Sequence, residues 1–332
     1  EVALTGQLAA GLLAIPGVTV YGTGDPELQT ATLSFNIDGL DCGEVAVVDI
    51  GIPPHIAAQV GPRQFLLSAA DIRGGLPPRP ADAHKGRTGH LLVVAGSPGK
   101  TGAAALTAMS ALRVGAGLVT AGVSRSLNPV MEALMLEAMT APLPESGNGA
   151  LGPSAREALL SLLQGKTCLA VGPGLGPAPE TGELVRDLVR SNPLPMVIDA
   201  DGLNHLAGHL DLLKGVAAAA VLTPHPGEMA RLLGTTAAAV QQDRIACARD
   251  LAGACRVHVV LKGARTVIAH PDGSVHVNPT GNPGMAAGGM GDVLTGAIAG
   301  LMTQGVRPDL AARAAVYLHG AETYFVNKLD LE

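Results

Sequence analysis

Aromatic residues are scarce in this sequence: its 332 residues include three Phe, three Tyr and no Trp. Proteins that bind single-stranded nucleic acid usually stack bases on aromatic side chains, and proteins that bind duplexes present a basic surface. The formal net charge is −6, so neither kind of surface is expected. We therefore predict no nucleic-acid partner. A small phosphorylated ligand held by backbone N–H groups is still compatible with this composition.

Cysteine is rare, and long apolar runs are missing. The four cysteines are too few for a disulfide scaffold and none belongs to a CxxC pair, which is typical of a reducing compartment. No apolar run approaches the roughly 18 residues of a membrane span, and the first residues lack the basic region of a signal peptide. We therefore predict a cytoplasmic protein with no membrane partner.

Small and apolar residues are abundant, with 44 glycines and 47% hydrophobic residues. A chain of this length and composition can bury one large core or two modest ones. Lysine is absent from residues 1–84, and the Pro- and Gly-rich stretch 74–83 indicates a linker or an extended arm. We therefore divide the chain into an N-terminal segment, 1–75, and a domain, 76–332.

Short apolar runs alternate with helical patterns along this domain, which is typical of a parallel sheet covered on both faces. The runs 266–270 and 274–278 flank Pro-Asp-Gly and predict a hairpin at the edge of that sheet. The sequence thus predicts a three-layer α/β/α sandwich with a mainly parallel central sheet, plus a short α+β N-terminal segment. The expected strands are 18–21, 31–37, 45–50, 90–95, 118–122, 167–172, 196–199, 219–223 and 257–262, with helices from about 102, 127, 180, 226, 289 and 309.

Glycine or polar residues follow most of the expected strands or open the helices. Because ligands of such sheets bind beyond the carboxyl ends of the strands, this concentration predicts a site more specifically than any single motif. The stretches are GSPGKT (96–101), GPGLG (172–176), DADGLN (199–204), TPHPGE (223–228), KGART (262–266) and GGMGD (288–292).

The stretch GGMGD precedes an apolar helix. Its three glycines allow a ligand to approach the backbone closely, and the helix start presents free N–H groups to an anion. Asp292 at this position is a candidate base for a substrate hydroxyl. The alternative is that Asp292 only caps the helix.

The other polar positions indicate less by themselves. His225 either touches the substrate or is structural, and Glu228 either acts on a magnesium-bound water or favours the helix dipole. Asp199 and Asp201 either share that ion or cap a turn. His205 and His209 have a metal-compatible spacing, but without an acidic residue as in HExxH a surface helix is favoured.

The Gly-Lys-Thr at 99–101 suggests the phosphate loop of an NTPase. That loop, GxxxxGK[ST], requires a glycine at position 94, which here is Val94, inside the expected strand. We therefore assign Lys100 no triphosphate role and place the phosphate-binding residues at 288–292.

Nine stretches in the second part of the chain form an ordered set: HKGRTGHLLVVAGS (84–97), GAAALTAMSALRVGAGLVT (102–120), VGPGLG (171–176), IDADGLN (198–204), LTPHPGEMARL (222–232), VLKGARTVI (260–268), NPTGN (278–282), GGMGDVLTGAIAGL (288–301) and AVYLHG (315–320). Together they resemble the ADP/ATP-dependent NAD(P)H-hydrate dehydratases of the ribokinase-like superfamily.

The resemblance implies a repair enzyme. Such enzymes act on the S epimer of NADH or NADPH that has gained water across the nicotinamide ring. They phosphorylate the added hydroxyl and eliminate phosphate, which restores the cofactor. Bacterial members mostly use ADP, giving AMP, and the sequence resembles that branch. The resemblance further implies Mg²⁺ as cofactor, hydrated NADH or NADPH and ADP or ATP as small-molecule partners, and a homo-oligomer.

Matching motif positions carries individual roles over to this chain. Asp292 would be the catalytic base, and Glu228 would act on Mg²⁺ through water. The residues implied to bind the hydrated cofactor are Thr101, Gly102, Ala103, Gly174, His225 and Asp292. Those implied to bind the adenine nucleotide are Lys262, Gly263, Ala264, Arg265, Thr266, Gly288, Gly289 and Gly291.

The N-terminal segment departs from this pattern. The stretch VVDIGIPP (47–54) resembles only the last strand of the epimerase domain that precedes bifunctional relatives, and residues 1–44 resemble a fragment of a cysteine desulfurase. A desulfurase requires a Schiff-base lysine, yet the first lysine is Lys85, and we expect Cys42 to be structural. We expect neither activity from residues 1–75. The C-terminus also looks short, because the family usually continues into a further helix.

Two other functions stay open. A ribokinase-like kinase of a small vitamin-precursor alcohol would share the GGMGD anion site but differ in the substrate side of the pocket, where GPGLG and TPHPGE favour the dehydratase. A non-catalytic nucleotide-binding protein would bind ADP without turnover.

Overall fold

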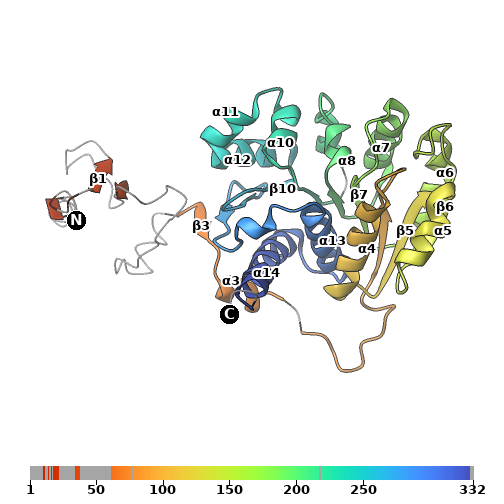
Figure 1. Cartoon of the computed structure of the whole chain (residues 1–332), viewed down its shortest axis with the longest axis horizontal. Helices are drawn as coiled ribbons and strands as arrows, with labels where there is room; N and C mark the ends of the chain where they lie inside the picture. The colour runs from red at the N-terminus through yellow and green to blue at the C-terminus, as the bar shows by residue number, and fades with distance from the viewer. Residues whose placement is uncertain are drawn as a thin grey trace. The chain divides into compact units, whose positions relative to one another are not determined.

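The computed structural model describes residues 61–329 except Pro77 and Ala217, together with residues 10–11, 14, 16, 18–21 and 34–37 (Figure 1). The chain forms two compact units, Glu1–Val60 and Gly61–Glu332. In the first unit, β1 (Val18–Tyr21) pairs antiparallel with β2 (Ser34–Ile37). The expected strand 45–50 lies outside the described residues. Residues 61–75, which we grouped with the N-terminal segment, lie in the second unit.

The described part of the second unit contains a ten-stranded sheet in the order β3-β12-β11-β10-β9-β8-β7-β4-β5-β6. Every pair of neighbours is parallel except the two pairs made by β11, so the prediction of a mainly parallel sheet is confirmed. The strands are β3 (Gln64–Leu66), β4 (His90–Val94), β5 (Leu118–Ser124), β6 (Met139–Leu143), β7 (Cys168–Val171), β8 (Met196–Ile198), β9 (Ala220–Leu222), β10 (His258–Leu261), β11 (Val267–Ala269) and β12 (Val275–Val277).

The hairpin formed by β11 and β12 is confirmed, but its predicted position at the sheet edge is wrong. Strand β3 pairs parallel with β12 and forms the edge instead. Three residues are too few to show the alternation of a strand, and all three are exposed, so no pattern marked β3. Strand β6, at the other edge, was not predicted either.

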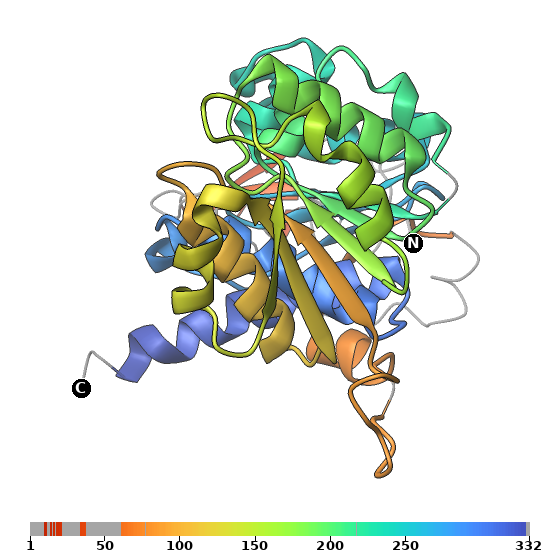
Figure 2. The ribbon, with the colours of Figure 1, turned by 90° about the vertical axis from the view of Figure 1, so that its right-hand side faces the viewer.

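Helices cover both faces of the sheet in two layers (Figures 1 and 2), which confirms the three-layer sandwich. Alternate residues of each strand face opposite layers: in β4, Leu92 and Val94 join one core, and Leu91 and Val93 join the other. The first layer contains α6 (Arg156–Leu162), α7 (Pro179–Ser191), α8 (Asp201–Asn204), α9 (Asp211–Lys214), α10 (Pro226–Leu233), α11 (Ala237–Gln242) and α12 (Arg244–Cys255); the second contains α3 (Ala69–Arg73), α4 (Thr101–Arg113), α5 (Asn128–Leu134), α13 (Met290–Thr303) and α14 (Pro308–Leu329).

Helices α4 and α13 lie in close contact in the second layer. A Cβ atom at Gly296 would collide with Ser110 and with the backbone of Thr107, so only glycine allows this approach. The contact fixes the first turn of α13, which carries Asp292, relative to the start of α4. Two stretches predicted to bind ligands are therefore held on one rigid pair of helices.

The order of the strands places a switch point between β4 and β7. The chain runs from β4 outward through β5 to β6, then returns to the other side of β4 and continues through β7 to β10. In open sheets of this kind, a crevice forms outside the carboxyl ends of the strands where the order reverses, and ligands bind there. The loops after β4 and β7 are the stretches 96–100 and 172–176.

Candidate active site

The loops after β4 and β7 are joined by hydrogen bonds at the switch point. The N–H of Gly96 donates to the carbonyl of Pro173 (2.8 Å), and the Ser97 hydroxyl donates to the carbonyl of Gly174 (2.7 Å). Gly174 has φ +64°, and a Cβ atom there would lie 2.9 Å from the Cβ of Ala103. The structure thus brings together Gly174 and the start of α4, Thr101–Ala103, as the predicted substrate contacts require.

Lys100 forms an ion pair with a carboxylate of the protein. Its Nζ donates to Oδ2 of Asp201 (3.2 Å), and the same oxygen accepts from the N–H of Gly176 (2.8 Å). Asp201 therefore links three of the stretches predicted to bind ligands, 96–101, 172–176 and 199–204. That Lys100 has no triphosphate role stays a prediction. His205 supports the same turn, because its Nε2 bonds the Gly176 carbonyl (2.8 Å). It lies just after α8, which ends at Asn204, so the surface helix expected for His205 and His209 is wrong.

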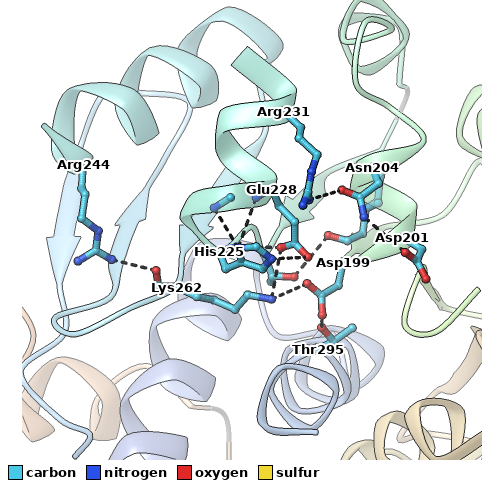
Figure 3. Close-up of polar contacts among 12 residues, drawn as sticks. Asp199, Asp201, Asn204, His225, Glu228, Arg231, Arg244, Lys262 and Thr295 are labelled. Carbon is cyan, nitrogen blue, oxygen red and sulfur yellow. Dashed lines mark hydrogen bonds and ion pairs between the residues drawn. The ribbon is translucent and has the colours of Figure 1, made fainter. Parts of the chain in front are cut away.

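A buried ion pair lies at the centre of the site (Figure 3). Asp199 follows β8 and is 1% exposed. Its Oδ1 accepts from Lys262 Nζ (2.8 Å) and its Oδ2 from the Thr295 hydroxyl (2.7 Å). Burial alone would lower the pKa of Lys262, but the charges of Asp199 and Glu228 raise it above its ordinary value. Asp199 thus keeps Lys262 charged and joins the loop after β10 to α13.

The two acidic residues of DADGLN point to different cations. Between them, Ala200 has φ +50° and ψ −121°, a conformation that costs a non-glycine residue about 1–3 kcal/mol. This turn directs Asp199 toward Lys262 and Asp201 toward Lys100. The two carboxylates therefore contact separate cationic side chains.

His225 and Glu228 form the start of α10 (Figure 3). His225 Nδ1 accepts from the N–H groups of Gly227 (3.0 Å) and Glu228 (3.4 Å), while the Glu228 carboxylate accepts from the His225 N–H (2.8 Å). Because Nδ1 is the acceptor, the ring proton lies on Nε2, which is 3.3 Å from Glu228 Oε1. The His225 side chain is still 49% exposed, so the ring can also meet a ligand.

The surroundings of Glu228 do not suit a direct magnesium ligand. Its two oxygens already face the His225 ring and backbone, and Lys262 Nζ lies 3.8 Å away. Mg²⁺ prefers several oxygen ligands in octahedral geometry, and within the described part of the chain no cluster of three or more His, Cys, Asp or Glu side chains could hold a metal ion. A role for Glu228 beside Mg²⁺ through water stays a prediction.

Asp292 lies in the first turn of α13 without capping it. Gly289 is the N-cap, with φ +89°, and no side-chain cap bond is made. Among the described residues, we find no hydrogen bond or ion pair to the half-buried Asp292 carboxylate. Burial, and then the charge of Asp199, raises its pKa to about 6. A carboxylate with these properties suits a general base that works near neutral pH. The capping interpretation is therefore wrong.

The predicted nucleotide-binding residues form two neighbouring surfaces. The stretch Lys262–Thr266 forms the turn after β10, in which the Thr266 hydroxyl donates to the Gly263 carbonyl (3.1 Å). The glycines of GGMGD open α13 beside it: a Cβ atom at Gly291 would lie 3.3 Å from Lys262 Nζ. Gly288 is exposed and Gly289 half-buried, so a ligand can reach the backbone here. The roles of these residues stay predictions.

Comparison with known proteins identifies the family. The profile of the NAD(P)H-hydrate dehydratase family matches residues 91–327. The chain belongs to this family. It is 52% identical over 279 residues to the bifunctional NAD(P)H-hydrate repair enzyme Nnr of Moorella thermoacetica, covering 84% of this chain and 53% of that protein. It is 40% identical to the ADP-dependent (S)-NAD(P)H-hydrate dehydratase of Neisseria meningitidis, covering 78% and 84%. The chain thus spans about half the length of the bifunctional relatives.

Solved structures support the dehydratase fold. The ADP/ATP-dependent NAD(P)H-hydrate dehydratase of Bacillus subtilis, co-crystallised with ATP and Mg²⁺, matches with a TM-score of 0.67 and 33% identity, covering 80% of this chain and 90% of that one. A ribokinase-like superfamily protein of Enterococcus faecalis matches with a TM-score of 0.69 and 25% identity, covering 80% and 89%. The predicted resemblance and the ribokinase-like fold are confirmed.

Two residues of this candidate site carried no signal in the sequence. Thr295 lies inside the apolar helix α13, where a threonine is unremarkable, yet it holds Asp199. Arg244 opens α12, a helix that was not predicted, and its side chain contacts the turn after β10. In both cases the partner lies far away in the sequence, so only the folded chain shows the role.

Proposed function

We propose that this protein repairs hydrated NADH and NADPH by dehydrating the S epimer with ADP, giving NAD(P)H, AMP and phosphate. Its membership of the dehydratase family supports the reaction. The observation that carries the proposal for this site is Asp292, a half-buried carboxylate with a pKa of about 6 that lies beside the glycine-rich start of α13. In this proposal the adenine nucleotide lies on the turn Lys262–Thr266 and the hydrated cofactor near Thr101–Ala103, Gly174 and His225.

The proposed reaction needs one base and a positive environment. Asp292 takes the proton of the added hydroxyl group while the hydroxyl oxygen attacks the terminal phosphorus of ADP. The bond between that phosphorus and the bridging oxygen breaks, and AMP leaves. The ring-nitrogen lone pair then expels phosphate, and loss of a proton from the neighbouring carbon restores NAD(P)H. Lys262 offsets the charge that develops on the transferred group, since its ammonium lies beside the Gly291 backbone.

Magnesium enters the proposal only with the nucleotide. Bound to phosphates, Mg²⁺ offsets their charge and usually keeps several of its waters. Two of the surrounding carboxylates are already engaged by protein groups: Asp199 accepts from Lys262, and Glu228 accepts from the His225 N–H. We therefore propose that Mg²⁺ would bind mainly to phosphate oxygens and water, and that Glu228 would interact with it through a water molecule.

The repair assay tests the proposal directly. The protein is incubated with the S epimer of hydrated NADH, Mg²⁺ and either ADP or ATP, and the absorbance of the reduced nicotinamide is followed together with AMP and phosphate release. We expect recovery of NADH with ADP and one phosphate per NADH. No recovery with either nucleotide would refute the dehydratase. A stable phosphorylated product from a small vitamin-precursor alcohol would favour the kinase, and ADP binding without turnover the non-catalytic alternative.

Assembly and location remain separate proposals. We propose a homo-oligomer, which light scattering of the purified chain can test, and a cytoplasmic protein. No described helix has both the length and the apolar character to cross a membrane. The chain spans about half the length of the bifunctional relatives, and we expect no epimerase or desulfurase activity from residues 1–75.

A further inference from the structure

Arg244 binds the turn that follows β10 from the side of α12. It is the first residue of that helix. Its NH1 group donates to the carbonyls of Ala264 (2.6 Å) and Arg265 (3.2 Å), and its NH2 group to those of Leu261 (2.9 Å) and Lys262 (3.1 Å). Figure 3 shows Arg244 at the backbone of Lys262, whose side chain runs in the other direction to Asp199. One guanidinium thus holds four carbonyls of one turn.

The turn bends closely around this guanidinium. Gly263 has φ +141°, and a Cβ atom there would lie 3.0 Å from Arg244 NH2. Arg265 has φ +57°, a backbone conformation that residues other than glycine rarely adopt. The backbone therefore follows an unusual course, and the hydrogen bonds to Arg244 offset its cost.

Holding the carbonyls also directs the N–H groups of the turn. In a trans peptide, the C=O and the following N–H point in opposite directions. Carbonyls that converge on Arg244 therefore turn the next N–H groups away from α12. The first of these, the N–H of Lys262, accordingly donates to the Pro224 carbonyl in the loop after β9 (2.8 Å). By the same geometry, the N–H of Gly263 points away from the guanidinium, because the preceding carbonyl of Lys262 accepts from Arg244. This is the side on which the proposed function places the nucleotide.

We propose that Arg244 is a positioning residue for the adenine nucleotide, which shapes the turn Lys262–Thr266 without touching the ligand. The inference rests on the proposed function, because that function places the nucleotide on this turn. It goes further because it makes the affinity for the nucleotide depend on Arg244, which lies outside the turn, on α12. The same contacts hold the backbone of Lys262, so they also place its ammonium against Asp199.

Lysine is not an adequate substitute at this position. Guanidinium presents five N–H donors in a fixed planar fork, whereas an ammonium is a point charge with three donors on a flexible stem. Burial lowers the pKa of Arg244, but an arginine stays charged at any working pH. Arg244→Lys therefore keeps the charge and loses the geometry.

The matched control is Arg249 on the same helix. Its Nε is buried and has no hydrogen-bond partner, and within the described residues we find no contact between its side chain and the turn. Arg249→Lys therefore makes the same chemical change on α12 without affecting the four carbonyls. Thermal unfolding of both variants measures any general loss of stability.

The test compares Arg244→Lys, Arg244→Ala and Arg249→Lys in the full chain. Calorimetry gives the Kd for ADP, and the repair assay gives KM for ADP, KM for hydrated NADH and kcat. We expect the Kd and KM for ADP to rise about 10- to 100-fold in the Arg244 variants, as expected for the loss of charge-assisted hydrogen bonds, while KM for hydrated NADH stays within about twofold. Arg249→Lys should match the unchanged protein, and added methylguanidinium should partly restore Arg244→Ala.

Each other outcome has a defined meaning. Unchanged ADP binding in Arg244→Lys, or equal increases in both KM values together with a lower Tm, would overturn the positioning role. If the unchanged protein binds ADP but does not restore NADH, the proposed function fails, while calorimetry still decides the role of Arg244. If it binds neither ADP nor ATP, both fail. If Arg244→Ala does not fold, Arg244→Lys carries the test.

Discussion

Clusters of buried or half-buried ionisable groups lie at both ends of the same sheet, and they are charged at one end and neutral at the other. At the carboxyl ends, Lys262 pairs with Asp199. At the amino ends, His258, His270 and His276 form a chain: Nδ1 of His258 lies 2.8 Å from Nδ1 of His270, and Nε2 of His270 lies 3.2 Å from Nδ1 of His276. Burial, and then the neighbouring histidines, lowers the pKa of His270 to about 3, so these rings are neutral at ordinary pH.

The two clusters also differ in whether they include an ionisable side chain without a partner among the described residues. Each histidine at the amino ends has a neighbouring ring as its partner, and the chain of rings links β10 to the hairpin of β11 and β12. At the carboxyl ends, the Asp292 carboxylate forms no hydrogen bond with the described residues and its pKa is raised to about 6. Buried ionisable groups therefore do not by themselves identify a functional site. An unpaired one beside glycine-rich loops is a better guide.

The largest expected effect is that of Asp292→Asn. An asparagine has nearly the same shape but cannot accept the hydroxyl proton, so we expect kcat to fall about 10²- to 10⁴-fold while the Kd for ADP changes little. The repair assay and calorimetry measure the two quantities. Asp309 lies in the first turn of α14, and its charge acts on His270 of the histidine cluster. The matched substitution there, Asp309→Asn, should leave kcat within about twofold. Full activity of Asp292→Asn would remove Asp292 from the catalytic role.

The next effect concerns the acid limb of the pH profile. The base works when ionised, so kcat/KM should fall as the pH drops below about 6, the pKa of Asp292. Asp199→Asn removes a negative charge that helps to raise this pKa, so the limb should move to lower pH, even if the displaced Lys262 lowers the plateau. A profile between about pH 5 and pH 8 measures the shift. An unmoved limb would mean that another group titrates.

A smaller effect appears in stability. The pKa of Asp292 rises from an ordinary 3.8 to about 6 on folding, so its contribution to stability is lost as the pH rises through that window. Asp292→Asn lacks this loss and should have a higher Tm than the unchanged protein above about pH 6, with the gain shrinking toward pH 4. Thermal unfolding at both pH values checks this. An equal or lower Tm above pH 6 would show that the carboxylate is better solvated than the structure indicates.

The smallest effect on activity is expected at the histidine cluster. The pKa of His270 falls from an ordinary 6.5 to about 3, so the stability it provides is complete above about pH 6.5 and is lost as the pH falls toward 3. Gln carries its donor and its acceptor on one carbon and does not match the spacing of the two ring nitrogens that contact His258 and His276. His270→Gln should therefore lower the free energy of unfolding by about 1–3 kcal/mol at neutral pH, and by less near pH 5, with kcat within about twofold. Denaturant unfolding and the repair assay test this. A large loss of kcat would contradict it and would show that the histidine cluster at the amino ends affects the candidate site at the carboxyl ends.

Much of the site was predictable because its stretches share one local property. Each follows a strand or opens a helix, and parallel strands bring their carboxyl ends to the same edge of the sheet. GPGLG and the start of α4 therefore met as expected, through Gly174 and Ala103. The predicted position of the hairpin at the sheet edge was wrong because β3, which forms that edge, is too short and too exposed to show a strand pattern.

The sequence by itself determined the family, the alternation of strands and helices, and which stretches border the site, since each depends on short-range order of residues. Only the tertiary structure decided which charges meet. Asp199 is 63 residues from Lys262 and 96 from Thr295, and Arg244 reaches a turn from a different helix. Such pairs follow from strand order and helix packing, which bring distant residues within bonding distance, and burial then makes each pairing energetically necessary.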